Sequence, residues 1–308
     1  MKRSILAFVV LAGTLAATPF VSNNYIVQQA TFICFYAALA MSWNFIGGYA
    51  GYPSFSTAAF LGLGAYAGAI LQNAGVPMVT AWLLATVVVG VFAALLGFAI
   101  LRMKGHYFAI GSISIVEVLR LIASSWSSFT GGGEGLNVKI LQGGPEYAGK
   151  VFFFSMFAVM VAAFIATCLV ERSRLGFALR CIEQNEDAAD MVGVRTTACK
   201  IEAFILSAIF CGTAGAISAS WTAYIAPVDA FSILITLKVP VMALLGGAGT
   251  VIGPMIGAFS FTIVEQVVWS RFLEYNQAIL GVVIVLLIFF LPGGLLKIQW
   301  RRSSNSKA

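Results

Sequence analysis

The sequence predicts an all-α, polytopic integral membrane protein of about ten membrane segments, some of them broken or partial. Three observations predict this class. The 308-residue chain is 60% hydrophobic and only 10% charged, which is far outside the composition of a soluble domain. Apolar runs close to twenty residues, long enough to cross a bilayer as a helix, recur along it. A single long polar stretch between spans, residues 171–200 (the polar loop), holds ten charged residues.

The first half of the chain contains most of the clear spans. Residues 1–23 place Lys2 and Arg3 before an apolar run, as in either a signal peptide or a first spanning helix, and we expect an uncleaved helix. Further spans are expected at 26–46, 56–71, 79–101, 107–122 and 151–170. The run Gly47–Ser54 after the second span cannot continue a helix cleanly, because it contains four glycine or proline residues. A Gly-rich loop is expected at 124–150.

The second half is less regular. A span at 201–225 carries small residues at i+4 spacing: Ala208, Gly212, Ala216 and Ser220. A turn at 227–229 follows, where Asp229 is expected to cap the next helix. Residues 231–245 would reach only about 22 Å as a helix, short of the roughly 30 Å hydrocarbon core, so we expect a broken or partial helix.

The remaining residues complete the predicted spans. The next span carries Gly249, Gly253 and Gly257, a stripe that allows close backbone approach, and extends to about residue 269. The last span is expected at 277–291, before a basic tail.

Lys and Arg residues gather on one predicted side of the membrane. Lys2/Arg3, Arg102/Lys104, the polar loop and the tail after 291 contain thirteen of the eighteen. Because positive residues collect in cytoplasmic segments, this side is predicted to be cytoplasmic, with both termini on it.

The same composition excludes several classes of site. The net charge of +6 reflects membrane topology and is no signal for nucleic acid. The five cysteines have no metal-type spacing, and a single histidine is present, so no metal and no cofactor is expected. We see no pairing of a nucleophile with a base and no phosphate-binding G-x-x-x-x-G-K-[ST] motif, so no catalytic residue is assigned and an enzyme is not expected.

The polar loop is expected to form two short helices. The first covers 173–183. The second starts after Asn185, a good N-cap, has Glu186 and Asp187 in its first turn, and ends at Gly193 in a left-handed conformation. These residues alone favour a connector lying on the membrane surface. The alternative is a helix that docks into another protein.

A family resemblance changes that balance. Asp187-Ala188-Ala189-x-x-x-Gly193 resembles the EAA loop of ABC importer permeases, Glu-Ala-Ala-x-x-x-Gly, with Asp in place of the first Glu. In that family this loop holds the coupling helix that docks into the ATPase subunit. The resemblance therefore implies an ATPase-coupling role for Glu186, Asp187, Ala188, Ala189 and Gly193.

Further stretches are similar to the LivM-type permease subunit of branched-chain amino acid importers. They run in order from about residue 40 to 260 and include Gly48-Tyr49-Ala50-Gly51, Glu117-Val118-Leu119-Arg120-Leu121 and Gly246-Gly247-x-Gly249-Thr250-x-x-Gly253-Pro254. Three positions depart from the family pattern: Ser56-Thr57, Glu183 and Lys238. The first and last fall in broken segments, so they put the exact substrate in doubt more than the transporter class.

The resemblance implies one permease domain, 1–308, in the bacterial inner membrane. It implies the partners of an importer: a LivH-type permease, two ABC ATPase subunits that hydrolyse ATP, and a periplasmic substrate-binding protein. The substrate would be a branched-chain or other hydrophobic amino acid. A urea or short-amide importer is an alternative within the same architecture, and an ion-coupled secondary transporter using Lys238 or Glu117 is an alternative of another class.

Candidate residues for a translocation path lie in the two broken segments, 47–56 and 231–253. Exposed backbone at membrane depth must face a cavity or protein, which favours a path over simple close packing. The candidates are Gly47, Gly48, Gly51, Pro53, Ser54, Lys238, Gly246 and Gly247. Glu117 and Arg120 are expected to pair with each other, Lys238 is able to reach the membrane interface, and Glu265 and His106 are expected to be interfacial.

Overall fold

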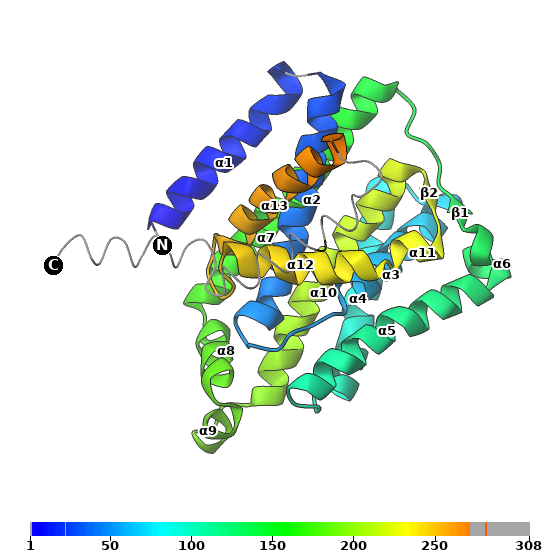
Figure 1. The fold of residues 1–308 in the computed structure, drawn as a ribbon. Coiled ribbons are helices and arrows are strands. Elements are labelled where there is room, and N and C mark those ends of the chain that lie inside the picture. The colour runs from blue at the N-terminus through cyan, green and yellow to red at the C-terminus, as the bar shows by residue number, and fades with distance from the viewer. Residues whose placement is uncertain (1, 22, 272–280, 282–308) are drawn as a thin grey trace.

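The computed structural model describes residues 2–21, 23–271 and 281, and within them the chain is a helical body (Figure 1). The predicted last span, 277–291, lies outside the described residues except for position 281, and so does the basic tail. The elements in order are α1 (Lys2–Val21), α2 (Asn24–Trp43), the π-helix η1 (Asn44–Gly48), α3 (Thr57–Asn73), α4 (Met78–Ile100), α5 (His106–Ser125), α6 (Ser127–Thr130), the 3₁₀-helix η2 (Gly132–Glu134), β1 (Leu136–Asn137), α7 (Pro145–Arg172), α8 (Arg174–Gln184), α9 (Glu186–Met191), α10 (Thr196–Thr222), β2 (Tyr224–Ile225), α11 (Pro227–Ala230), α12 (Ile233–Gly246) and α13 (Gly253–Arg271).

Six of the described helices are long and apolar enough to cross a membrane, which makes the chain a multi-pass membrane protein. They cover Asn24–Gly48, Met78–Ile100, His106–Ser125, Pro145–Arg172, Thr196–Thr222 and Pro227–Gly246. The stretches Ser4–Phe20 and Gly253–Val268 are shorter apolar helices. The helices predicted for 1–23, 56–71, 79–101 and 107–122 are confirmed, with small shifts at their ends.

The helix α10 is central to the packing, because its small residues allow α3 and α4 to approach it closely. A Cβ atom added at Gly64 of α3 would lie 2.1 Å from the backbone oxygen of Gly212 in α10. One added at Gly212 would lie 2.8 Å from the side chain of Val89 in α4. The i+4 stripe of small residues is therefore a close-packing surface. On the other side of the body, α2 packs against α7 and α13.

A two-stranded antiparallel ribbon joins two distant loops at the end of the molecule opposite α9 (Figure 1). Leu136 of β1 pairs with Ile225 of β2, and Val138 donates a backbone hydrogen bond of 2.9 Å to Ala223. The loop predicted at 124–150 is thus partly ordered. It also ends earlier than expected, because Pro145 starts α7 at a position where its missing N–H costs nothing.

Two of three local predictions for the second half are wrong. Asp229 does not cap α12: it lies in the first turn of α11, and the N-cap position of α12 is Ser232. Residues 233–246 form a helix of 14 residues that continues through Pro240 and is separate from α11; at about 21 Å it is a partial helix, as predicted. Gly249 precedes α13, in a left-handed conformation with φ +75°, so only Gly253 and Gly257 of the glycine stripe belong to that helix.

Candidate functional site

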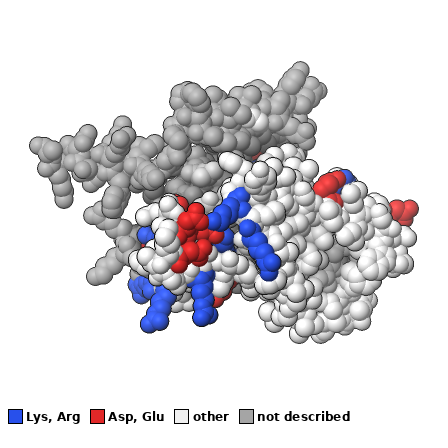
Figure 2. All heavy atoms as spheres, turned by 90° about the horizontal axis from the view of Figure 1, so that it is seen from below, with Lys and Arg blue, Asp and Glu red and all other residues white. Residues whose placement is uncertain are grey.

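The polar loop folds into the two predicted helices, α8 and α9, at one end of the molecule. The Ser173 hydroxyl accepts a 3.3 Å hydrogen bond from the Gly176 N–H and caps α8. The Asn185 side chain accepts one of 3.1 Å from the Ala188 N–H and caps α9, as predicted. Gly193 has φ +88°, which confirms the left-handed turn after α9. Figure 2 shows that acidic and basic side chains gather on this end.

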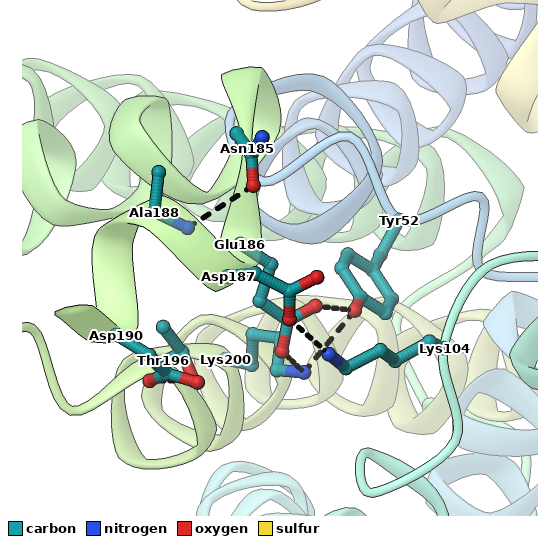
Figure 3. A network of polar contacts seen from close by, with 9 residues as sticks. All are labelled: Tyr52, Lys104, Asn185, Glu186, Asp187, Ala188, Asp190, Thr196 and Lys200. Carbon is teal, nitrogen blue, oxygen red and sulfur yellow. Dashed lines mark hydrogen bonds and ion pairs between the residues drawn. The ribbon is translucent and has the colours of Figure 1, made fainter.

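A buried ion pair attaches α9 to α10. The Lys200 ammonium lies 2.6 Å from a carboxylate oxygen of Glu186, and the two side chains are only 2% and 13% exposed. The Tyr52 hydroxyl donates to the same carboxylate and accepts a hydrogen bond of 3.2 Å from Lys200 (Figure 3). Burial, and then the Glu186 carboxylate, raise the pKa of Tyr52 above its usual value, so its hydroxyl stays protonated and remains a donor. We call Tyr52, Glu186 and Lys200 the buried triad.

The triad brings together three parts of the chain that are distant in sequence. Tyr52 lies in the first broken segment, Glu186 begins α9 and Lys200 lies in the second turn of α10. In the sequence, Lys200 counts among the charges of the polar loop, and no pattern there points to Tyr52. Because α10 begins at Thr196, Lys200 belongs instead to a spanning helix. The only sequence signal for them was a lysine flanked by apolar residues.

A second contact connects α9 to the turn between α4 and α5. The Lys104 ammonium lies 2.5 Å from Asp187 on the surface (Figure 3). The hydrogen bond and the charge of Asp187 raise the pKa of Lys104. Asp190 accepts a hydrogen bond of 2.8 Å from the Thr196 hydroxyl. Glu186, Asp187 and Asp190 of α9 therefore each bind a side chain from another part of the same protein.

Two large apolar side chains are exposed at the C-terminal end of α9. Met191 and Val192 are 83% and 79% exposed, whereas Ala189 is buried against the body of the protein. Ala188 and Gly193 are exposed. Sequence reasoning included Ala189 in a surface for another protein, and its burial shows that it packs within this chain. It also missed Met191 and Val192 as site residues, although two apolar residues at the end of a polar segment were a usable signal.

The start of η1 is bound to the second broken segment through Asn44, a residue that no sequence pattern singles out. Asn44 is fully buried at the start of η1. Its side-chain amide donates to the Thr250 carbonyl at 3.0 Å, and its side-chain oxygen accepts from the Gly249 N–H at 2.8 Å. A Cβ at Gly48 would lie 2.6 Å from the Gly249 nitrogen, so this approach requires glycine.

Side chains from neighbouring helices satisfy the backbone of the first broken segment. The Trp43 indole N–H donates to the Ser54 carbonyl at 2.7 Å. The Phe55 N–H donates to the Ser112 hydroxyl of α5 at 2.9 Å. Backbone that leaves a helix at membrane depth needs such partners, because lipid offers none.

The predicted path residues fall into three groups. Gly48, Ser54, Gly246 and Gly247 are buried, Gly47, Pro53 and Lys238 are half-buried, and Gly51 is exposed. At Gly246, an added Cβ would lie 1.7 Å from the Gly253 carbonyl oxygen, so α12 and α13 touch there. These contacts explain the glycines at Gly48 and Gly246 by close approach, and the assignment of these residues to a path stays a prediction.

Two ion pairs lie within the described spans and α13. Glu117 accepts from the Arg120 Nε at 2.9 Å, which confirms the expected pair. Lys238 of α12 forms an ion pair with Glu265 of α13. The sequence did not indicate this pairing, and the interfacial positions expected for Lys238 and Glu265 stay predictions. His106 lies exposed at the start of α5.

Comparison with known proteins gives a consistent result. The family model described as branched-chain amino acid transport system / permease component matches residues 25–289. The chain is 28% identical to the high-affinity branched-chain amino acid transport system permease protein LivM of Salmonella typhimurium, over 96% of this chain and 75% of the relative. It is 26% identical to the LivH permease protein of the same-named system in Escherichia coli, over 85% of this chain and 91% of the relative.

A more distant match is 25% identical: the autoinducer 2 import system permease protein LsrC of Shigella flexneri, over 72% of this chain and 66% of the relative. No solved structure matches the chain. The family model covers most of the chain, including Asn44, the polar loop and both broken segments. The chain therefore belongs to the family of branched-chain amino acid transport system permease components, as a LivM-type member.

Proposed function

We propose that this chain is the transmembrane permease subunit of an ABC importer that moves branched-chain or other hydrophobic amino acids into the cytoplasm. The observation that carries the proposal is the family match across residues 25–289. The chain itself does no covalent chemistry. ATP is hydrolysed by separate subunits, and this chain supplies part of the route through the membrane.

The proposal includes the partners and the placement in the bacterial inner membrane. The second permease is LivH-type; in support, the LivM and LivH proteins of Escherichia coli are both named as permease proteins of one transport system. Two ATPase subunits and a periplasmic binding protein complete the importer. The whole chain, 1–308, forms one domain of about ten membrane segments, with the polar loop and both termini in the cytoplasm, as the distribution of Lys and Arg favours.

The ATPase subunits dock on the polar loop. Asp187-Ala188-Ala189-x-x-x-Gly193 supports this assignment, and so does the exposure of Met191 and Val192 beside it. Apolar side chains exposed in an otherwise charged segment are typical of a protein contact. The inward side of α9 then transmits the movement, because Glu186 contacts both Lys200 of α10 and Tyr52 of the first broken segment.

Movement of α9 reaches the candidate path through these contacts. The first broken segment includes Gly47, Gly48, Gly51, Pro53 and Ser54, and its Gly48 packs against Gly249 of the second. When the ATPases close, α9 pulls on the residues that join α2 to α3, and access switches from outside to inside. Lys238, Gly246 and Gly247 of the second segment are the remaining path candidates.

The docking surface is tested with Met191→Asp in the co-expressed importer. A carboxylate on this apolar surface must be desolvated on docking, so the ATPase subunits are expected to be lost on purification and ATP-driven uptake with them. Ile140→Asp is the matched control for co-purification of the ATPases, because Ile140 is similarly exposed at 78% but lies near β1 at the opposite end. A Met191→Asp complex that still contains its ATPases would contradict the docking surface.

Uptake by proteoliposomes tests the transport assignment itself. Leucine uptake is expected to require both ATP and the ATPase subunits, and to be reduced by excess isoleucine or valine but not by urea. Uptake that an ion gradient drives without ATPases would assign the chain to secondary transporters. Competition by urea would assign it to an importer of small amides.

A further inference from the structure

The helix α5 carries an ion pair on the face that it turns away from the rest of the molecule. Phe108, Ser112, Val116 and Ala123 are its buried residues. Ile110, Ser114, Glu117 and Leu121 follow one another at spacings of four, three and four residues, which places them along one stripe on the opposite face. We call these four residues the α5 stripe. Arg120 lies beside it and binds Glu117.

The charges lie deep within the span. The helix has twenty residues, so it is about 30 Å long, the thickness of the hydrocarbon core. Glu117 is therefore about 16 Å from the His106 end, close to the middle. The guanidinium of Arg120 is directed back toward Glu117, which takes it toward the membrane centre. This geometry is the opposite of an arginine that reaches out to the interface.

The neighbouring helix α4 shows what a lipid-facing helix of this protein looks like. In α4 and in α5 alike, only 22% of the most apolar stretch of the helix is buried in the body of the protein. Yet α4 contains no charged residue, and its exposed face carries Leu84, Val87, Val91 and Leu95. At equal burial, α5 presents a serine, a glutamate and an arginine, with Glu117 and Arg120 still 39% and 30% exposed. Lipid cannot solvate these groups, and charges at this depth face protein or water.

We propose that the α5 stripe is the surface on which the second permease subunit packs within the membrane. The proposal rests on the proposed function, because it takes the partner to be a permease of the same importer. A residue spacing of four and three is the pattern by which two helices interlock side chains, and serine and charged residues contribute hydrogen bonds across helix pairs in membranes. Figure 1 shows α5 at the edge of the molecule, where a second chain has access to it.

The partner must be a membrane protein, because the stripe runs along a spanning helix. The two named permeases of the Escherichia coli system both resemble this chain, so a partner of related fold can present a helix of matching length. Polar groups on that helix then complete the solvation of Glu117 and Arg120. The ion pair also fixes the register of the two helices, because a slip of one turn would move it against apolar side chains.

Site-specific photocrosslinking in the complete importer tests the proposal. A benzoylphenylalanine is placed at Leu121 on the stripe or at Leu84 on α4, which are similarly exposed at 52% and 47%. Ultraviolet light is expected to join Leu121→benzoylphenylalanine to the second permease and to give no adduct from position 84. An adduct from 84 without one from 121 would overturn the proposal.

Other results separate the possible occupants of the stripe. An adduct between two copies of this 32.7 kDa chain, or one within a single chain, would assign the stripe to another occupant and overturn the proposal. An intact complex that gives no adduct at Ile110, Ser114 or Leu121 would mean that lipid covers the stripe, and would overturn the proposal as well. If the chain is not an importer subunit at all, the ATPases and the second permease will be absent from the purified preparation before any irradiation. That outcome is distinct from a complete complex in which position 121 gives no adduct.

Discussion

Lys200 is a buried cation at the start of a spanning helix, and Glu186 and Tyr52 are the groups that make its burial tolerable. A buried charge that keeps its partner costs little, while one that loses it destabilises the structure strongly. The buried triad therefore acts as a specific connection at the base of α9. It is weak evidence for overall stability and strong evidence for a defined position of the loop.

We expect Lys200→Met to release α9 from the body. Glu186 would keep a buried carboxylate without its cation, which costs about 3 kcal/mol or more. Hydrogen exchange of the α9 amides should then be about 100-fold faster than in the unchanged chain, because exchange reports the free energy of local opening. Mass spectrometry of peptides covering 186–192 measures this.

The double variant Glu186→Gln, Lys200→Met is the control. The neutral amide needs no cation and can keep a hydrogen bond with Tyr52, so exchange should return most of the way to the original rate. Equal exchange rates in the single and double variants would show that the charge of Lys200 does not hold α9.

Asn44 is the second residue with a large expected effect. Replacing it by leucine leaves the Gly249 N–H and the Thr250 carbonyl without their partner in a buried place, at a cost of about 2 kcal/mol or more. We expect a lower melting temperature in detergent and a loss of uptake. Thr31→Val on the same helix should cost about 1 kcal/mol or less, because the Thr31 hydroxyl bonds only the Val27 carbonyl of its own turn. Similar losses in both variants would contradict a special role for Asn44.

At the scale of elements, the helix contacts depend on small residues more than on interlocking large ones. The α3–α10 contact places Gly64 against Gly212, and Gly68 against Ala216. Helices in a membrane gain little from burying apolar surface, since lipid is equally apolar, so close backbone approach contributes more. The aromatic residues Phe60, Phe108 and Phe204 then fill the space between α3, α5 and α10 at centroid distances of 5.0 and 6.2 Å.

Gly64→Ala is expected to separate α3 from α10. The new methyl group would lie 2.1 Å from a backbone oxygen, which cannot move away as a side chain would, and overpacking of this kind costs about 1–3 kcal/mol. Thermal unfolding in detergent measures the effect. Gly90→Ala on α4 is the control, because its methyl group would meet Ile209 at an ordinary 3.5 Å, and its stability should change by less than about 1 kcal/mol. If Gly64→Ala melts no earlier than Gly90→Ala, the close contact is not limiting.

At the scale of the whole molecule, the polar loop and the β1–β2 ribbon lie at opposite ends of the helical body (Figure 1). The proposed importer needs these ends in different compartments: α9 must meet a cytoplasmic ATPase, and the ribbon end must meet the binding protein. The proposed mechanism therefore requires that the polar loop lie on the cytoplasmic side of the membrane and the β1–β2 ribbon on the other side.

Labelling of single cysteines tests this orientation. Val192→Cys and Ile140→Cys, each in a chain without its native cysteines, are about equally exposed but lie at the two ends. In intact spheroplasts, a membrane-impermeant maleimide should modify position 140 and spare 192, and lysis should make both reactive. Modification of 192 from outside would place the loop beyond the reach of any cytoplasmic ATPase and exclude the coupling mechanism.

The sequence by itself determined the class of the protein, most of its helices and the caps of α9. These properties are local: a run of apolar residues needs a bilayer or a core, and Asn185 and Gly193 act on their own turns. Only the tertiary structure decided which side of α9 faces the body, that Lys238 pairs with Glu265, and that Asn44 joins two segments about 200 residues apart. The physical reason is that a polar group within a membrane takes whatever partner the packing of helices brings to it, and that partner leaves no mark on the neighbouring sequence.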